Sequence, residues 1–432
     1  MYRFIEKQLV QWKMQGNRKP LILRGLRQVG KTYSVLDFGK KYFSGKVHLI
    51  DFEKRPDLHP IFETNLDVQR IVSELELVLN IHIEPGSDLL FFDEIQNCPR
   101  ALSALRYFYE DMPELHVIAA GSLLDFSLNI ISFPVGRVQF MEMYPLSFEE
   151  FLLAMGKDIA VNFLKTDNEN ISSTLHSLLL DDVRKYFFIG GMPECVKIFA
   201  EKGKYQPVFD VQSHLIETFR EDFSKYAPLA DKRCLNSVLI NSARSVGKQI
   251  IYSHLTEGFS NPTIKNAFDL LTKARLLYRI PSASPAGIPL AASASKKKFK
   301  ALFADIGLMQ NLCGIRTGEE LFKSDLLAIY NGALAEQFVG QELLVHSHNP
   351  LYYWARDAKS STAEVDYLFE KNGKIIPLEV KSGSGGRLKS LHLLLKTFFH
   401  IDSGYVCSSA SFATLPEQKL KFIPLYAVSR LV

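Results

Sequence analysis

The sequence predicts an α/β fold with a largely parallel β-sheet at its core, and two observations predict it. In the first 150 residues, short apolar runs alternate with helical patterns, which is typical of strands joined by crossover helices. A glycine-rich loop lies between the first such run and the helix that follows it. The predicted strands of this part are residues 21–23, 47–52, 89–93 and 116–120.

The loop has the complete G-x-x-x-x-G-K-[ST] pattern of a phosphate-binding loop. Its residues are Gly25, Leu26, Arg27, Gln28, Val29, Gly30, Lys31 and Thr32. Backbone N–H groups of such a loop and the N-terminus of the next helix together favour phosphate. Lys31 is expected to reach the β- and γ-phosphates and the Thr32 hydroxyl to contact Mg²⁺. The sequence therefore predicts binding of a nucleoside triphosphate.

An acid pair follows the apolar run 89–92, which reads as a buried central strand. Asp93 is expected to hold Mg²⁺, and Glu94 to polarise the attacking water as a general base. Ser122 follows the next strand and is either a contact of the γ-phosphate or a helix N-cap. Arg137 is either an arginine that stabilises the transferring phosphate, in the same subunit or across a boundary, or a surface residue.

Two other nucleotide-binding classes are the natural rivals. A guanine-nucleotide switch would carry an N-K-x-D segment, which the chain lacks, and the acid pair suits ATPases of the additional-strand type better. A small-molecule kinase would usually be shorter, without two further domains.

The chain has 432 residues, a net charge of +4 and five widely spaced cysteines with no C-x-x-C, which favours a cytoplasmic protein without disulfides or zinc. The sequence contains no predicted membrane span.

Residues 146–230 are helical in pattern, and residues 231–330 carry fourteen Lys or Arg against seven Asp or Glu. In this second segment, residues 250–277 resemble a helix-turn-helix, and residues 279–304 resemble a wing. Such a unit could contact nucleic acid, DNA more readily than RNA. It could equally serve only to pack or to contact a protein.

The last hundred residues read as a separate α/β unit that starts with a helix. Strands are predicted at residues 351–354, 364–369, 375–381 and 404–407. Asp366, Glu379 and the helical Glu336 are hard oxygen donors suited to Mg²⁺, and Lys381 shares a strand face with Glu379. These residue types suit metal-dependent phosphodiester cleavage. An amphipathic hairpin with a solvated charged face would give the same pattern.

Together these segments resemble bacterial and archaeal AAA-superfamily ATPases whose C-terminal domain, of unknown function, is similar to the PD-(D/E)xK nuclease fold. The motifs that carry the resemblance are LRGLRQVGKT (23–32), DEIQ (93–96), AGS (120–122), GR (136–137), YPLSFEEF (144–151), GGMP (190–193), ADIGL (304–308), EVD (364–366) and EVKSG (379–383). The resemblance implies binding of ATP with Mg²⁺, a helical lid after the ATPase core and a winged-helix-like middle. Relatives often have threonine before the glycine of the ADIGL segment.

The predicted domains are 1–145, a P-loop ATPase core; 146–230, a helical lid; 231–330, a winged-helix-like connector; and 331–432, a PD-(D/E)xK nuclease-like domain. The first hypothesis for function is an ATP-driven switch or motor acting on nucleic acid. The second is a signalling or scaffold ATPase whose last domain binds a protein or DNA without cleaving it.

Overall fold

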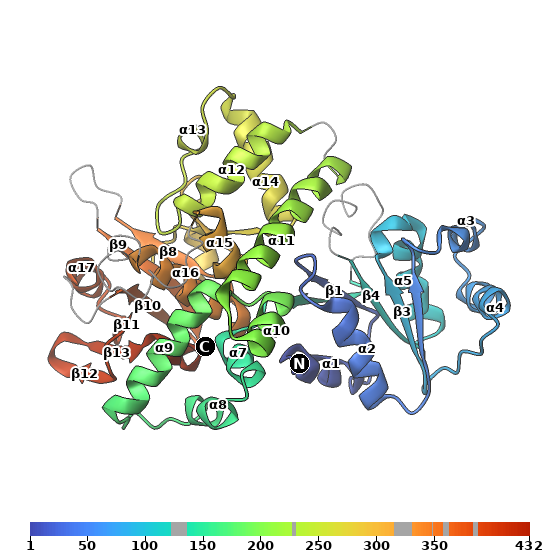
Figure 1. Cartoon of the computed structure of the whole chain (residues 1–432), viewed down its shortest axis with the longest axis horizontal. Coiled ribbons are helices and arrows are strands. Elements are labelled where there is room, and N and C mark those ends of the chain that lie inside the picture. The colour runs from blue at the N-terminus through green and yellow to red at the C-terminus, as the bar shows by residue number, and fades with distance from the viewer. Residues whose placement is uncertain (122–135, 227–229, 315–330, 348, 357–362, 383–387) are drawn as a thin grey trace. The chain divides into compact units, whose positions relative to one another are not determined.

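The computed structural model forms two compact units. The first comprises Met1–Tyr144 with Lys273–Arg275, and the second comprises Pro145–Thr272 with Leu276–Val432. Each unit has its own sheet and helices (Figure 1). The structure describes all residues except 122–135, 227–229, 315–330, 348, 357–362 and 383–387.

The first unit is built on a five-stranded parallel sheet in the order β2-β3-β4-β1-β5. Strand β3 is buried along its whole length, as its apolar run predicts. Strand β4 separates it from β1, the arrangement expected of the additional-strand type. Strand β5, at the edge, was not predicted. The strands are β1 Leu21–Gly25, β2 Val47–Asp51, β3 Leu89–Asp93, β4 His116–Ala120 and β5 Gln139–Met143.

Helices cover both faces of this sheet. The helices α3, α4 and α5 pack on the face that carries Ile22, Leu90 and Phe92, and α2 packs on the other face, where Gly39 contacts Leu89 (Figure 1). The helices are α1 Ile5–Lys13, α2 Lys31–Tyr42, α3 His59–Glu63, α4 Val68–Leu79 and α5 Pro99–Asp111, with short 3₁₀ turns at Pro56–Leu58 and Ile95–Asn97. Both faces of the sheet are thus removed from water, as a parallel sheet requires.

The second unit begins with five helices, in the segment where the sequence predicts helices. They are α7 Phe148–Ala154, α8 Asp158–Leu164, α9 Ser173–Ile189, α10 Pro193–Lys202 and α11 Tyr205–Tyr226. Helix α7 starts with a capping box, in which the Ser147 hydroxyl accepts from the Glu150 N–H and the Glu150 carboxylate accepts from the Ser147 N–H. The motif YPLSFEEF therefore contains a helix start.

Three helices and an antiparallel hairpin follow, and then a short helix. They are α12 Lys232–Arg244, α13 Tyr252–Leu255, α14 Asn261–Lys273, β6 Leu277–Pro281, β7 Phe299–Phe303 and α15 Ile306–Leu312, with a 3₁₀ turn at Leu290–Ser293. This order agrees with the predicted helices and wing; the winged-helix class itself remains a prediction.

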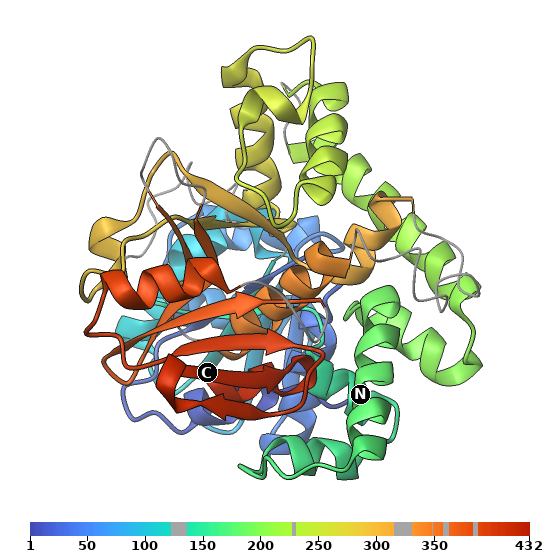
Figure 2. The same cartoon turned by 90° about the vertical axis from the view of Figure 1, so that its left-hand side faces the viewer.

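A six-stranded mixed sheet forms the end of the chain, in the order β12-β13-β11-β10-β9-β8 (Figure 2). Strands β12 and β13 were not predicted. Ala283 and Leu290, from the loop between β6 and β7, pack in the same core as Trp354 and Leu394, so the hairpin and this sheet share a hydrophobic core. The elements are α16 Asn331–His346, β8 Tyr352–Ala355, β9 Glu364–Lys371, β10 Lys374–Val380, α17 Lys389–Thr397, β11 Gly404–Ser408, β12 Ala413–Leu415, β13 Leu420–Pro424, and 3₁₀ turns at Pro416–Gln418 and Leu425–Leu431.

Two motifs of the sequence, GGMP and ADIGL, meet inside this unit. Asp305 is fully buried; its carboxylate accepts from the Gly191 N–H at 2.5 Å and from the Leu308 N–H at 2.9 Å. Gly190 has φ +72°, and a Cβ there would lie 2.3 Å from Asp305 Oδ1. These motifs therefore join two helix ends. Among the described residues, no helix combines the length and apolar character that a membrane span needs.

The contact between Gly190 and Asp305 predicts an unequal response of two glycines to the same substitution. Gly190→Ala should lower the free energy of unfolding by roughly 2–5 kcal/mol, because the new methyl group adds overpacking to the strain of a left-handed backbone. Gly203→Ala, at φ +65° with nothing within 4 Å of the new Cβ, should cost about 1–2 kcal/mol. Thermal unfolding of both variants measures this, and equal losses would contradict the packing role of Gly190.

The buried Asp305 carboxyl also predicts a pH dependence of stability. Burial raises its pKa from 3.8 to about 6, against the backbone N–H donors that lower it. A raised pKa stabilises the fold fully below the unfolded value, and this contribution of about 3 kcal/mol is lost as the pH rises through about 6. Urea unfolding between about pH 4.5 and 7 should show the wild type losing stability relative to Asp305→Asn, whose amide does not titrate. Parallel curves for the two proteins would rule this out.

Candidate functional site

The glycine-rich loop connects the carboxyl end of β1 to helix α2, as predicted. Lys31 is the first residue of α2 and is buried, and its ammonium donates to the carbonyls of Gly25 and Leu26, both at 3.0 Å. Burial lowers the pKa of Lys31 to about 8, while the charges of Glu94 and Asp93 raise it. The ammonium is thus held over the loop, beside the two acids that follow β3.

Gly25 is required where the loop leaves the sheet. A Cβ at this position would lie 2.2 Å from the carbonyl oxygen of Met143, which is its register partner on β5. No side chain fits this close approach of two backbones. The unpredicted strand β5 therefore forms one wall of the loop. Its Glu142 lies near enough to Lys31 for its charge to raise the pKa of the amine, a role that the sequence did not suggest.

The two residues proposed to hold Mg²⁺ lie together. The Thr32 hydroxyl donates to Asp93 Oδ2 at 2.6 Å, although 61 positions separate them in the chain. Asp93 is buried, which raises its pKa, and the hydrogen bond from Thr32 opposes that shift. A hydroxyl and a carboxylate at this spacing are hard oxygen donors that suit Mg²⁺.

Glu94 turns away from the sheet directly after β3. Its backbone is left-handed, with φ +47°, and Gln96 Nε2 donates to its carboxylate at 2.5 Å. Burial raises the pKa of Glu94, and the Gln96 hydrogen bond and the charge of Lys31 lower it. Gln96 thus orients the Glu94 carboxylate. The sequence analysis gave Gln96 no role, although it stands two residues after Glu94 in the DEIQ segment.

Of the other two predicted catalytic residues, the structure describes one. Ser122 lies outside the described residues. Arg137 precedes β5, whose Gln139 pairs with the first residue of β1, so it lies at the amino edge of the sheet, opposite the loop. There its guanidinium donates to Glu110 at 2.7 Å. In this arrangement Arg137 lies at the other end of the strands from the loop of its own chain, and its catalytic role remains a prediction.

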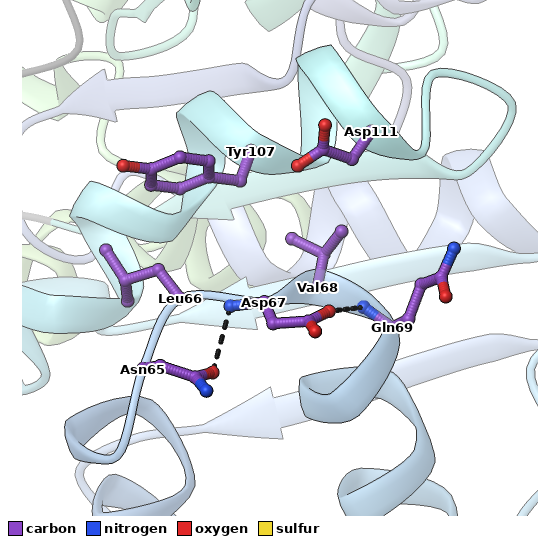
Figure 3. Close-up of a pocket in the computed structure, with 7 residues that line it drawn as sticks. All are labelled: Asn65, Leu66, Asp67, Val68, Gln69, Tyr107 and Asp111. Carbon is purple, nitrogen blue, oxygen red and sulfur yellow. Dashed lines mark hydrogen bonds between the residues drawn. The ribbon is translucent and has the colours of Figure 1, made fainter.

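A surface cavity of about 740 Å³ lies elsewhere in the first unit (Figure 3). It is lined by Asn65, Leu66, Asp67, Val68, Gln69, Tyr107 and Asp111. The Asp67 carboxylate caps helix α4 by accepting from the Gln69 N–H, and the Asn65 side chain accepts from the Asp67 N–H. Two of its polar side chains thus already serve the backbone, and the cavity is distinct from the loop.

The four residues predicted in the last hundred positions do converge in the second unit. Asp366 on β9 accepts from the Val380 N–H at 2.8 Å, and Lys381 lies 2.6 Å from Glu379 Oε1. Glu379 is buried. The alternative of an amphipathic hairpin without a site predicts that this charged face of the strand is solvated. Burial raises the pKa of Glu379 to about 7 and that of Glu336 to about 8, and the Asp366 charge adds to both shifts.

A fifth residue, Lys300 on β7, was not predicted and lies among these acids. Its ammonium is 2.8 Å from Glu336 Oε1, 2.5 Å from Glu364 Oε1 and 3.4 Å from Asp366 Oδ1. Only 3% of its side chain is exposed. The sequence gave no clear signal for this role: Lys300 follows the basic run 296–298, and all five residues of β7 are buried.

The acids of this group do not fit a metal ion as arranged. Among the residues that the structure describes, no three His, Cys, Asp or Glu side chains are placed to hold one. The cation that three of the carboxylates contact is the Lys300 ammonium. The prediction that Glu336, Asp366 and Glu379 jointly ligate Mg²⁺ therefore does not match their arrangement, because a lysine from the connector lies between them.

Comparison with protein-family models gives three matches. Residues 17–152 match an AAA domain, residues 180–319 match a domain of unknown function (DUF8612), and residues 331–428 match a second one (DUF4143). No curated protein matches the chain.

Among solved structures, similar ones include a point variant of RuvB of Thermotoga maritima, with 15% identity over 64% of this chain and 89% of that chain at a TM-score of 0.30. AMPPCP-bound DnaA of Aquifex aeolicus has 12% identity over 62% and 86% at 0.29. The Orc1 protein of Aeropyrum pernix in complex with DNA has 11% over 72% and 90% at 0.26. Scores this low carry no argument, so the class rests on the family model and the loop geometry.

Residues 17–152 thus form an AAA-type P-loop domain of the nucleotide-binding ATPase class. The match covers the loop, the acid pair and all five strands of the first sheet. The two domains of unknown function assign no activity to the second unit.

Proposed function

We propose that this chain is a Mg²⁺-dependent ATPase that works as a nucleotide-driven switch or motor, with nucleic acid, DNA rather than RNA, as its target. The observation that carries the ATPase part is the 2.6 Å hydrogen bond between Thr32 and Asp93, with Lys31 and Glu94 beside it. Such a group places a phosphate contact, two metal ligands and a base at one edge of the sheet.

Each side chain has a defined task in this proposal. The Lys31 ammonium moves from the carbonyls of its own loop to the β- and γ-phosphates of ATP. Thr32 and Asp93 hold Mg²⁺, which neutralises charge that develops on the transferring phosphate. Glu94, oriented by Gln96, accepts a proton from the attacking water. Ser122 as a γ-phosphate contact remains part of the proposal, and so does Arg137 as the arginine that stabilises the transferring phosphate, in the same subunit or across a subunit boundary.

Two observations support nucleic acid as the target. Residues 231–330 carry an excess of basic residues, and the helices and hairpin of this segment follow the order of a winged helix. The helix–three strands–helix–strand order of α16 to β11 is the order expected of a PD-(D/E)xK domain. The proposal extends to cleavage of the nucleic acid, which would be carried out by Glu336, Asp366, Glu379 and Lys381.

The alternative is a signalling or scaffold ATPase whose last domain binds a protein or DNA and does not cleave. The position of Lys300 among Glu336, Glu364 and Asp366 favours it, because an ammonium there competes with the metal that cleavage needs. Under this alternative, nucleotide binding controls assembly.

The ATPase proposal predicts different losses in different variants. Lys31→Ala should lose ATP binding, because its ammonium is the proposed contact of the β- and γ-phosphates. Glu94→Gln should keep ATP binding and lose turnover by roughly 10²–10⁴-fold, the usual contribution of a general base. Thr32→Val should lose the effect of Mg²⁺, and Thr32→Ser should retain it.

ATP hydrolysis and calorimetric ATP binding measure these effects. Lys40→Ala is the matched control, because this exposed lysine lies on the same helix, away from the loop. Turnover in Lys31→Ala equal to that in Lys40→Ala would disprove the proposed site.

A separate measurement decides between the two proposed roles. If nucleic acid is the target, duplex DNA should stimulate ATP turnover, and RNA should stimulate it less. If the protein is a scaffold, neither polymer should change turnover, and ATP should instead change the assembly state in light scattering. Stimulation by DNA in the wild type and its absence in Glu94→Gln would favour the first role.

A further inference from the structure

A buried arginine near the start of the chain contacts the backbone of the phosphate-binding loop. Arg3 is only 7% exposed. Its Nη1 donates to the Val29 carbonyl of the loop at 2.9 Å, and its Nη2 donates to the Tyr144 carbonyl at 2.6 Å. Tyr144 directly follows β5, the strand whose Met143 carbonyl approaches Gly25. One guanidinium therefore joins the N-terminal segment, the loop and the end of β5, all within the first unit.

The shape of the guanidinium fixes these two carbonyls relative to each other. An arginine stays charged at any ordinary pH, and its burial is costly unless its N–H groups are bonded. Two of these groups bond with carbonyls that lie 26 and 141 positions away in the chain. Because the guanidinium is planar and its donors form a rigid fork, the Val29 carbonyl is held in one position against the end of β5.

The Arg3 bond also sets the direction of the next N–H group. The peptide bond between Val29 and Gly30 is trans, so the Gly30 N–H points the opposite way from the Val29 carbonyl. In the described part of the chain, this N–H donates to no protein acceptor. Gly30 is the N-cap residue of α2, and a helix start favours phosphate. The bond therefore directs an N–H group away from Arg3 and leaves it available to a ligand.

The other buried cation of the loop cannot keep the loop in shape once nucleotide binds. Lys31 donates to the carbonyls of Gly25 and Leu26, and these bonds break when its ammonium moves to the phosphates in the proposed reaction. Arg3 bonds with a different carbonyl of the loop and has no need to move. The orientation of the Val29–Gly30 peptide then depends on Arg3 both before and after the nucleotide arrives.

We propose that Arg3 is a positioning residue of the nucleotide site: by holding the carbonyls of Val29 and Tyr144, it fixes the Gly30 N–H in the direction from which this group donates to the β-phosphate. The inference rests on the proposed ATP site. It applies to ADP as well as ATP, because the backbone N–H groups of such a loop contact the α- and β-phosphates. Arg3 itself does not touch the nucleotide.

The test follows the Gly30 amide of the full chain by NMR while ADP and Mg²⁺ are added. Labelling of valine carbonyl carbons and glycine nitrogens restricts the spectrum to the Val–Gly pairs, which are 29–30, 135–136, 246–247 and 339–340. In the wild type, ADP should move the Gly30 proton resonance downfield, because the N–H gains a hydrogen bond to a charged acceptor. In Arg3→Met this shift should disappear, and the dissociation constant for ADP should rise roughly tenfold to hundredfold.

Two further variants separate orientation from stability and from charge. Arg18→Met is the matched control, because Arg18 also donates to two backbone carbonyls of the first unit, those of Pro113 and Glu114, which precede β4 and lie at the edge of the sheet away from the loop. This variant should keep both the shift and the affinity. Arg3→Lys keeps the positive charge but cannot reproduce the fork, so it should weaken ADP binding, although less than Arg3→Met does.

Thermal unfolding shows which variants are folded, and if Arg3→Met is not, Arg3→Lys decides. A folded Arg3 variant with the shift and affinity of the wild type would overturn the inference, and so would an equal loss of affinity in Arg18→Met. A wild type that binds ADP without moving the Gly30 resonance would overturn it without any variant. A wild type that binds neither ADP nor ATP is a distinct outcome, because it removes the ATPase proposal and this inference with it.

Discussion

Burial of charge is the physical constraint on which both sites of this protein depend. Lys31, Asp93, Lys300 and Glu336 are each at most about a tenth exposed, and a charge removed from water must find a partner of fixed geometry. The partners of Lys31 are backbone carbonyls of the loop, the partner of Asp93 is the Thr32 hydroxyl, and the partners of Lys300 are carboxylates. Each charged atom is therefore held in one place before any ligand arrives.

The two buried lysines differ in the charge of their partners. At the loop, the partners of Lys31 are neutral carbonyls, which an incoming triphosphate can replace with a gain in electrostatic energy. In the second unit, the partners of Lys300 are the charged carboxylates of Glu336 and Glu364, so the ammonium is held by ion pairs. The ammonium of the first site can therefore exchange its partners for a ligand, whereas the ammonium of the second is already paired with carboxylates.

Three of the sequence motifs have structural roles and do not contribute the residues described at either site. The GGMP and ADIGL segments meet where Asp305 accepts the Gly191 N–H, and the YPLSFEEF segment contains the capping box at Ser147. Glycine occurs at position 190 because a Cβ there would collide with Asp305, and Asp305 occurs where its carboxylate accepts backbone N–H groups at two helix ends. A motif shared along a protein class therefore marks packing as readily as chemistry.

The sequence by itself determined the features that depend on neighbours in the chain. The loop 25–32 and the fully apolar run before Asp93 are contiguous patterns, so their local conformations follow from backbone chemistry and burial alone. Strand β5, at a sheet edge, has a mixed burial pattern and gave no such signal.

Tertiary structure decided what depends on residues far apart. It placed Arg137 at the sheet edge opposite the loop and Lys300 next to Asp366, 66 positions away. No local pattern encodes these outcomes, because they follow from the strand order and from the packing of the hairpin on the last sheet. The sequence could name the acids of the second unit, but only the fold could supply the cation between them.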